Sequence, residues 1–167
     1  MAVAPFAPEI ILAVGRGGFY PGTLISHILQ AEIYPVRISR RFRDVVKYDS
    51  PEWLVRPPEV VKGRRVLIVD EICDSGETLA IVRAEVKNMG ANQVKCAVLY
   101  AHVRSVAIPN YIGLITDALI LNPWDREIWQ DGAFQFHPEY VAALAAQGLT
   151  PDSSLQIRVN PIKIAKG

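Results

Sequence analysis

Two neighbouring carboxylates, Asp70 and Glu71, directly follow the apolar run Val66–Val69. The run lacks the alternation of a half-exposed strand, so it predicts a parallel strand buried on both faces. Ligands of open α/β sheets bind at the carboxyl ends of the strands, where this pair stands. Two adjacent like charges need a cation or several hydroxyl donors beside them. A ribose diol together with a divalent metal would meet that need.

The turn that follows has the residue types of a phosphate site, namely Asp74, Ser75, Gly76, Glu77 and Thr78. Glycine lets the backbone approach a ligand, two hydroxyls offer donors, and the free N–H groups of a helix amino end favour phosphate. In an alternative interpretation, Asp74 or Ser75 only caps the helix. Capping leaves Asp70 and Glu71 unexplained, so we favour adjacent diol and phosphate sites.

Two other phosphate motifs are excluded by spacing. The sequence has no Gly-x-x-x-x-Gly-Lys run, and a dinucleotide fingerprint that starts at Gly15 would need glycine where Tyr20 stands. The sequence therefore predicts neither a nucleoside triphosphatase nor a dehydrogenase.

Hydrophobic periodicity predicts the elements that must position these residues. Strands are expected at Ile10–Val14, Tyr34–Ile38, Val66–Val69, Lys95–Tyr100, Ala118–Leu121 and, at a sheet edge, Gln156–Ile164. Helices are expected from Pro21 onward, at Thr78–Met89 with Gly90 as its stop, and at Pro138–Gln147 before Gly148. The alternation of strands and helices predicts a right-handed, mostly parallel α/β sheet.

Charge is distributed unevenly along the chain. Its 167 residues carry a formal net charge of +1, which gives no general reason to bind nucleic acid or acidic membranes. The segment from Arg37 to Arg65, however, has nine basic residues against four acidic ones. This segment is either a solvated surface loop or a mobile flap that closes on a polyanion.

The length and the cysteine content limit the classes of protein to which the chain can belong. A chain of 167 residues fits one compact domain. Its two cysteines, Cys73 and Cys96, are not spaced as a metal or redox motif, which indicates neither a disulfide scaffold nor a zinc site and favours a reducing compartment. The first residues lack the basic region of a signal peptide, and no apolar run approaches the ~20 residues of a membrane span. We expect a soluble, cytoplasmic protein.

The segment Val66–Leu79 resembles the phosphoribosyl pyrophosphate signature of the type I phosphoribosyltransferases. Ala13–Gly18 is similar to the pyrophosphate loop of the xanthine-guanine and hypoxanthine enzymes, and Asn122–Asp125 to the base-site segment of the bacterial xanthine-guanine enzymes. The resemblance covers roughly residues 10 to 130. It implies a twisted, mostly parallel sheet flanked by helices, with a small hood.

The implied activity is transfer of a phosphoribosyl group from phosphoribosyl pyrophosphate to N9 of a 6-oxopurine, with Mg²⁺ required. On this resemblance, Asp70 and Glu71 hold the ribose hydroxyls, directly or through the metal. The turn from Asp74 to Thr78 holds the 5′-phosphate. Arg16 and Gly17 meet the pyrophosphate, in a loop where the family can have a strained or cis peptide.

The resemblance also implies contacts to the base. Asp74 would face N7 and act as general base. His102 stands where the xanthine-guanine enzymes have a lysine that donates to O6, and its proton depends on pH. Ile120 and Asp125 would complete the base site, whereas Leu119 stands where an aromatic residue usually stacks. Stacking would then come from elsewhere, for example from Trp124.

The implied organisation is a single domain over residues 1–167, with a flexible loop at about 39–56 and a hood and C-terminal extension at about 102–167. Relatives imply a homo-oligomer, a dimer or a tetramer, in the cytoplasm. Two alternatives stay open. The acceptor is another nucleobase, or the protein is a regulatory protein that binds phosphoribosyl pyrophosphate without transferring its sugar.

Overall fold

The chain divides into two compact units, Met1–Asp117 and Ala118–Gly167. A computed structural model describes residues 2–42 and 45–155 of these units. The edge strand expected at Gln156–Ile164 lies outside the described residues. Among the helices that are described, none is long and apolar enough to cross a membrane.

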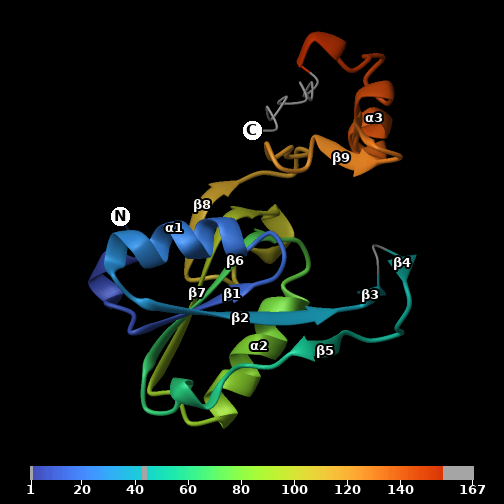
Figure 1. Ribbon diagram of the computed structural model, residues 1–167. Coiled ribbons are helices and arrows are strands. Elements are labelled where there is room, and N and C mark those ends of the chain that lie inside the picture. The colour runs from blue at the N-terminus through green and yellow to red at the C-terminus, as the bar shows by residue number, and fades with distance from the viewer. Residues whose placement is uncertain (1, 43–44, 156–167) are drawn as a thin grey trace, which may run out of the picture. The chain divides into compact units, whose positions relative to one another are not determined.

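The first unit is built on a six-stranded sheet of order β5-β2-β1-β6-β7-β8 (Figure 1). Its strands are β1 (Ile10–Val14), β2 (Glu32–Ser39), β5 (Glu52–Val55), β6 (Arg65–Cys73), β7 (Gln93–Ala101) and β8 (Tyr111–Ile115). All neighbours are parallel except β5, which is antiparallel to β2. The predicted fold class, a mostly parallel sheet flanked by helices, is confirmed.

The central strands are continuous apolar runs because both of their faces are covered. Helix α1 (Phe19–Leu29) packs Ile25 and Leu29 on the face that contains Ile11 and Leu67. Helix α2 (Glu77–Asn88) covers the opposite face, where its buried side chains are Leu79, Val82 and Val86. The two helices lie on opposite sides of the sheet in Figure 1. The buried parallel strands inferred from the sequence are therefore confirmed.

The strand order reverses between β1 and β6. The chain runs from β1 outward to β2 on one side, then returns to β6 and continues outward to β7 on the other side. Such a reversal opens a crevice at the carboxyl ends of the two strands. The loop after Val14 and the turn after Cys73 both emerge there.

One expected strand is absent, and several strands were not expected. Ala118–Leu121 forms no strand. The strand beside β7 is instead β8, whose apolar run is interrupted by Gly113 and therefore gives a weak signal. In addition, the segment between Ile38 and Val66 contains β5 and two short strands, β3 (Arg41–Phe42) and β4 (Val45–Val46).

The second unit contains a hairpin and a helix. Strands β9 (Glu127–Gln130) and β10 (Ala133–Phe136) are joined by Asp131 and Gly132, which both have positive φ, the conformation of a tight hairpin turn. Helix α3 (Pro138–Ala145) confirms the predicted terminal helix. Trp129 packs edge-on against Phe134, with ring centroids 5.1 Å apart.

Candidate active site

A pocket of about 310 Å³ lies at the crevice between β1 and β6. It is lined by Val14, Gly15, Arg16, Gly17, Ile38 and every residue from Asp70 to Leu79. The structure therefore brings together the two segments that the sequence singled out, one after β1 and one after β6. A volume of this size suits a small ligand.

The carboxyl group of Asp70 is buried at the end of β6. Its Oδ1 accepts a hydrogen bond of 2.8 Å from the backbone N–H of Glu71. Burial raises the pKa of Asp70 from its usual 3.8 to about 7, and the neighbouring charge of Glu71 acts in the same direction. The pocket thus disfavours a second negative charge, so a cation or hydroxyl donors beside Asp70 would be stabilising.

Glu71 and Gly17 touch across the pocket floor. A Cβ atom on Gly17 would lie 1.3 Å from Oε2 of Glu71, so the carboxylate occupies the space that any side chain at this position would need. The peptide bond between Gly15 and Arg16 in the same loop is cis, as the resemblance implied. The loop after β1 is therefore packed against Glu71 of the acidic pair (Asp70 and Glu71), and a side chain at position 17 would displace the Glu71 carboxylate.

The β6–α2 turn (Asp74–Thr78) leads into the amino end of α2. Gly76 has a φ of 82° and stands immediately before the helix. Ser75 Oγ accepts a 3.4 Å hydrogen bond from the N–H of Glu77. The N-cap position of α2 is held by Gly76, without a side-chain cap hydrogen bond, so neither Asp74 nor Ser75 caps the helix as the alternative interpretation expected. All five residues of the turn line the pocket, as a phosphate-binding turn requires.

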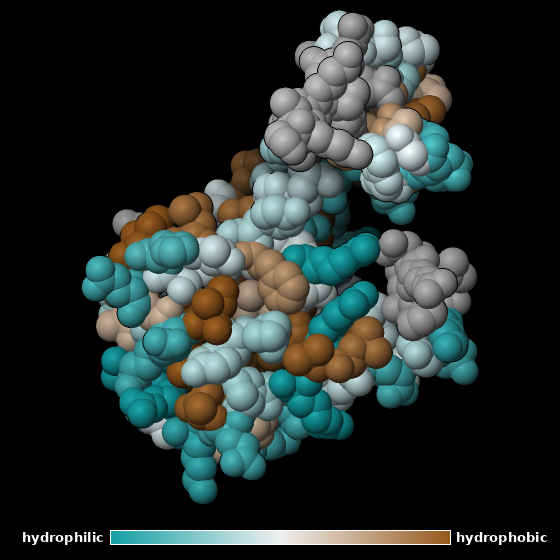
Figure 2. All heavy atoms as spheres, viewed as in Figure 1, coloured by the Kyte–Doolittle hydropathy of each residue, from teal (hydrophilic) through white to brown (hydrophobic). Residues whose placement is uncertain are grey.

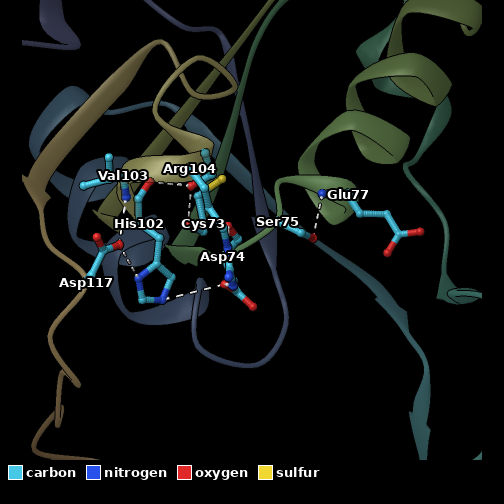
Figure 3. Close-up of polar contacts among 9 residues, drawn as sticks. Cys73, Asp74, Ser75, Glu77, His102, Val103, Arg104 and Asp117 are labelled. Carbon is cyan, nitrogen blue, oxygen red and sulfur yellow. Dashed lines mark hydrogen bonds and ion pairs between the residues drawn. The ribbon is translucent and has the colours of Figure 1, made fainter.

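Asp74 contacts His102 and Arg104, two members of a group that we call the His102 cluster (His102, Arg104 and Asp117), shown in Figure 3. Arg104 pairs with Asp74 Oδ1 through Nη2 and donates a 3.3 Å bond from Nε to the Asp74 carbonyl. His102 Nε2 lies 3.7 Å from the same Oδ1. His102 Nδ1 lies 3.3 Å from Asp117 Oδ1. The structure thus places His102 beside the proposed general base.

The short 3-10 helix Val103–Ser105 fixes the His102 cluster against the end of β6. Ser105 is buried, and its Oγ donates to the Cys73 carbonyl at 2.6 Å. The N–H of His102 donates to the same carbonyl at 3.1 Å. These bonds attach the residues after β7 to the residue that precedes Asp74.

Arg104 and Asp117 were missed by sequence reasoning. Asp117 lies 15 residues after His102 and outside any recognised motif. Only the pairing of β7 with β8 brings them together, and β8 itself was not expected. Arg104 stands two residues after His102, so proximity in sequence was its only signal.

Ile120 and Asp125 belong to the second unit, and each is half-buried there. Asp125 Oδ2 accepts a 2.9 Å bond from Nδ2 of Asn122, which is buried. Their contact with a base stays a prediction.

The acidic pair fits a magnesium ion that arrives with its substrate. Within residues 2–42 and 45–155, no three metal-ligating side chains gather in one place. Mg²⁺ is commonly held by one or two carboxylates together with substrate phosphates and water. Asp70 and Glu71 supply that number of carboxylates, and burial of Asp70 disfavours its charge unless a cation is present.

These features define an open α/β protein with its pocket at a topological switch point. The sequence model of the phosphoribosyl transferase domain matches residues 3–132, and the chain belongs to that family, a class of glycosyltransferase enzymes. The resemblance inferred from the sequence is confirmed.

Three relatives illustrate the range of the family. The structure of a purine phosphoribosyltransferase from Pyrococcus horikoshii has a TM-score of 0.65 and 31% identity, covering 74% of this chain and 81% of that one. The xanthine-guanine phosphoribosyltransferase of Cereibacter sphaeroides is 28% identical, over 71% of this chain and 70% of its own. The adenine phosphoribosyltransferase of Bordetella pertussis is 29% identical over 54% of each chain. The chain thus spans about half the length of that last relative.

Proposed function

We propose that the protein transfers the phosphoribosyl group of phosphoribosyl pyrophosphate to a purine base, namely guanine, xanthine or hypoxanthine, in purine salvage. The observation that carries this proposal is the shared pocket. It is lined by the acidic pair for the ribose, by the β6–α2 turn for the 5′-phosphate, and by Arg16 and Gly17 for the pyrophosphate. Each part of the activated sugar thus meets a group of suitable chemistry.

In the proposed reaction, the bond between C1′ and the pyrophosphate oxygen breaks, and a bond between C1′ and N9 of the purine forms. Negative charge collects on the departing pyrophosphate while the ribose gains oxocarbenium character. Arg16 stabilises the leaving group, and the acidic pair orients the ribose. Mg²⁺, when held by Asp70 and Glu71, supplies further positive charge to the pyrophosphate. Asp74 accepts the proton that the base loses.

The basic segment at about 39–56 is proposed to close over the pocket and exclude water. In this proposal residues 1–167 act as one phosphoribosyltransferase domain in the cytoplasm, and residues from about 102 onward serve as hood and extension.

A homo-oligomer, a dimer or a tetramer, is part of the proposal. Helix α1 exposes an apolar stripe in which Leu24 and Ile28 are 61% and 57% exposed. Figure 2 shows hydrophobic residues, in brown, over this helix. An exposed stripe of this kind is typical of a subunit contact. Light scattering on the unchanged protein and on Leu24→Glu would test it, and a monomer in both cases would contradict it.

Adenine is a second candidate acceptor, because one relative bears that name. The decisive measurement is release of pyrophosphate from phosphoribosyl pyrophosphate and Mg²⁺ with guanine, xanthine, hypoxanthine, adenine or uracil. We expect turnover with the 6-oxopurines. Turnover with uracil alone would refute the purine assignment. Binding of phosphoribosyl pyrophosphate without turnover of any base would indicate the regulatory protein instead.

The role of Asp74 is tested by Asp74→Asn. We expect turnover to fall by about 100-fold, in the range of general base catalysis, while the variant still binds ribose 5-phosphate. If turnover stays within a factor of two, Asp74 is not the general base.

A further inference from the structure

The β6–α2 turn is covered by a side chain from another part of the sheet. Gly76 lines the pocket, yet it is buried. A Cβ atom on Gly76 would lie 2.6 Å from Cγ1 of Ile108 and 3.1 Å from its Cβ and Cγ2, so the Ile108 side chain is packed against the bare backbone of this glycine. Ile108 belongs to the connection between β7 and β8, which contributes none of the residues that line the pocket.

Glycine at position 76 gives the turn conformational freedom as well as its shape. Gly76 has a φ of 82°, which glycine adopts without steric cost, and glycine loses more conformational freedom on ordering than any other residue. A turn that must be ordered each time a phosphate binds loses part of its affinity to that ordering. The side chain packed on Gly76 restricts the turn beforehand and so preorganises it for a ligand.

Arg83 of α2 holds the backbone that carries Ile108. Its Nη2 donates to the Ile108 carbonyl at 2.5 Å and to Oδ1 of Asn110 at 3.4 Å. Its Nε donates to Sγ of Cys96 at 3.3 Å. All three acceptors are neutral groups, so these contacts depend on the direction of the N–H bonds rather than on an ion pair. The guanidinium thus joins α2 to β7 and to the connection that follows it.

The two ends of this connection are held by other residues. Near its start, Ser105 Oγ donates to the Cys73 carbonyl at 2.6 Å. At its end, the N–H of Asn110 donates to the Cys96 carbonyl at 2.8 Å, and Asn110 Oδ1 accepts from the Cys96 N–H at 2.9 Å. Arg83 therefore acts on the middle of the connection, which is the part packed on the turn.

We propose that Arg83 is a positioning residue for the 5′-phosphate, because it holds Ile108 against Gly76 and so keeps the β6–α2 turn in the conformation that binds the phosphate. The inference rests on the function proposed above. Arg83 does not line the pocket and acts through Ile108. Its loss should therefore weaken ligands that carry the 5′-phosphate and spare those that bind at Arg16 and Gly17.

The direct test compares two ligands by calorimetry. Ribose 5-phosphate carries the 5′-phosphate, whereas pyrophosphate with Mg²⁺ is proposed to meet the loop after β1. Arg83→Met removes the N–H donors and keeps an apolar stem. We expect it to weaken ribose 5-phosphate about fivefold, the order of the affinity lost when one residue has to be fixed on binding. Binding of pyrophosphate should change by less than about twofold.

Two further variants separate hydrogen bonding from charge. Arg83→Lys keeps the positive charge but lacks the planar fork of donors, so it should weaken ribose 5-phosphate nearly as much as Arg83→Met. Lys87→Met removes a positive charge from an exposed position of the same helix and is the matched control, with unchanged affinity expected. If Arg83→Lys binds as tightly as the unchanged protein while Arg83→Met does not, the charge is responsible and the inference is wrong.

Steady-state rates separate positioning from a loss of folded protein. Arg83→Met should raise KM for phosphoribosyl pyrophosphate about fivefold and change kcat by less than about twofold, because the phosphate is held alike in the ground state and in the transition state. A smaller folded fraction would instead lower kcat at an unchanged KM. That result would assign Arg83 a purely structural role and overturn the inference.

Ile108→Ala provides the test if Arg83→Met does not fold. It removes the side chain that lies on Gly76 but leaves the carbonyl that Arg83 binds, and it should also weaken ribose 5-phosphate about fivefold. In the double variant the loss should be no larger than in either single variant, because both act on one contact. Additive losses, or an unchanged affinity in Ile108→Ala, would contradict the inference.

The same measurements distinguish failure of the inference from failure of the proposed function. If the unchanged protein binds neither ribose 5-phosphate nor phosphoribosyl pyrophosphate and turns over no base, the proposed function fails, and the inference fails with it. If the unchanged protein binds and turns over its substrates and the Arg83 and Ile108 variants do so equally well, the inference alone fails.

Discussion

Two regions of the first unit, the one that lines the pocket and the His102 cluster that contacts it at Asp74, are built differently. The acidic pair and the β6–α2 turn take their side chains from nine consecutive residues, Asp70–Thr78. The His102 cluster takes its side chains from two strand ends that meet only in the folded sheet. The first region is a local motif and the second is a product of topology. The proposed functions differ accordingly, because the first is proposed to hold the sugar phosphate and the second contains His102, whose contact with the base stays a prediction.

The largest effect is expected from the acidic pair. Asp70→Asn, and separately Glu71→Gln, should lower kcat/KM by about 100-fold or more, because each removes a carboxylate that is proposed to orient the ribose and to hold Mg²⁺. Initial rates of pyrophosphate release measure this effect. The ratio of the rates with guanine and hypoxanthine should stay unchanged. A change in that ratio would show that the two regions are not separate.

Gly17→Ala is expected to lower kcat/KM by about tenfold to 100-fold. Its Cβ would lie 1.3 Å from Glu71 Oε2, so either the loop or the carboxylate must move. The double variant Gly17→Ala with Glu71→Ala relieves the clash and serves as the control for folding, read by thermal unfolding. Full activity in Gly17→Ala would contradict the packing of this loop against the acidic pair.

Gly76→Ala should destabilise the protein by about 1–3 kcal/mol, because residue 76 has a φ of 82° and its Cβ would lie 2.6 Å from Ile108 Cγ1. Ile108 belongs to the connection between β7 and β8, which also contains His102 and Arg104, so this variant tests where the two regions touch. Denaturant unfolding measures the loss. Gly132→Ala has a similar φ of 81° with open space around it and isolates the backbone contribution. Equal losses in both variants would argue against the Ile108 contact.

The smallest effect is a pH dependence of stability. The folded chain binds the Asp70 proton more tightly than the unfolded chain, since the pKa rises from 3.8 to about 7. The contribution of this group to stability is therefore fully present below about pH 4 and is lost as pH rises through about 7. Between about pH 6 and pH 8 the loss should be roughly 1 kcal/mol, or a few degrees in Tm. Asp70→Asn should remove this slope, and a slope that persists would assign it to other groups.

Much of the fold could be predicted from the sequence, because the central strands are continuous apolar runs and the glycines mark real turns. Gly90, whose φ is 86°, follows the end of α2, where the sequence predicted that the helix stops. Strand β8 could not be found, since Gly113 breaks its pattern and its last residues are exposed. The apolar run at Ala118–Leu121 misled the prediction because it looked like a buried strand, but it contains no strand.

The part of the candidate site that comes from local motifs could be predicted from the sequence, and the part that comes from strand pairing could not. The residues from Asp70 to Thr78, with Arg16 and Gly17, line one pocket, as their spacing and the resemblance indicated. Arg104 and Asp117 could not be found, because charged pairs between separate connections leave no periodic signal. Their contacts follow from strand pairing, which a single sequence specifies only weakly.

The reversal of strand order between β1 and β6 has a consequence for engineering. Residues 102, 104 and 117 follow β7 and β8 and lie outside Asp70–Thr78. A library at position 117 alone leaves both the sequence of that segment and the contacts of Asp74 in place, whereas changes at positions 102 and 104 also alter the surroundings of Asp74.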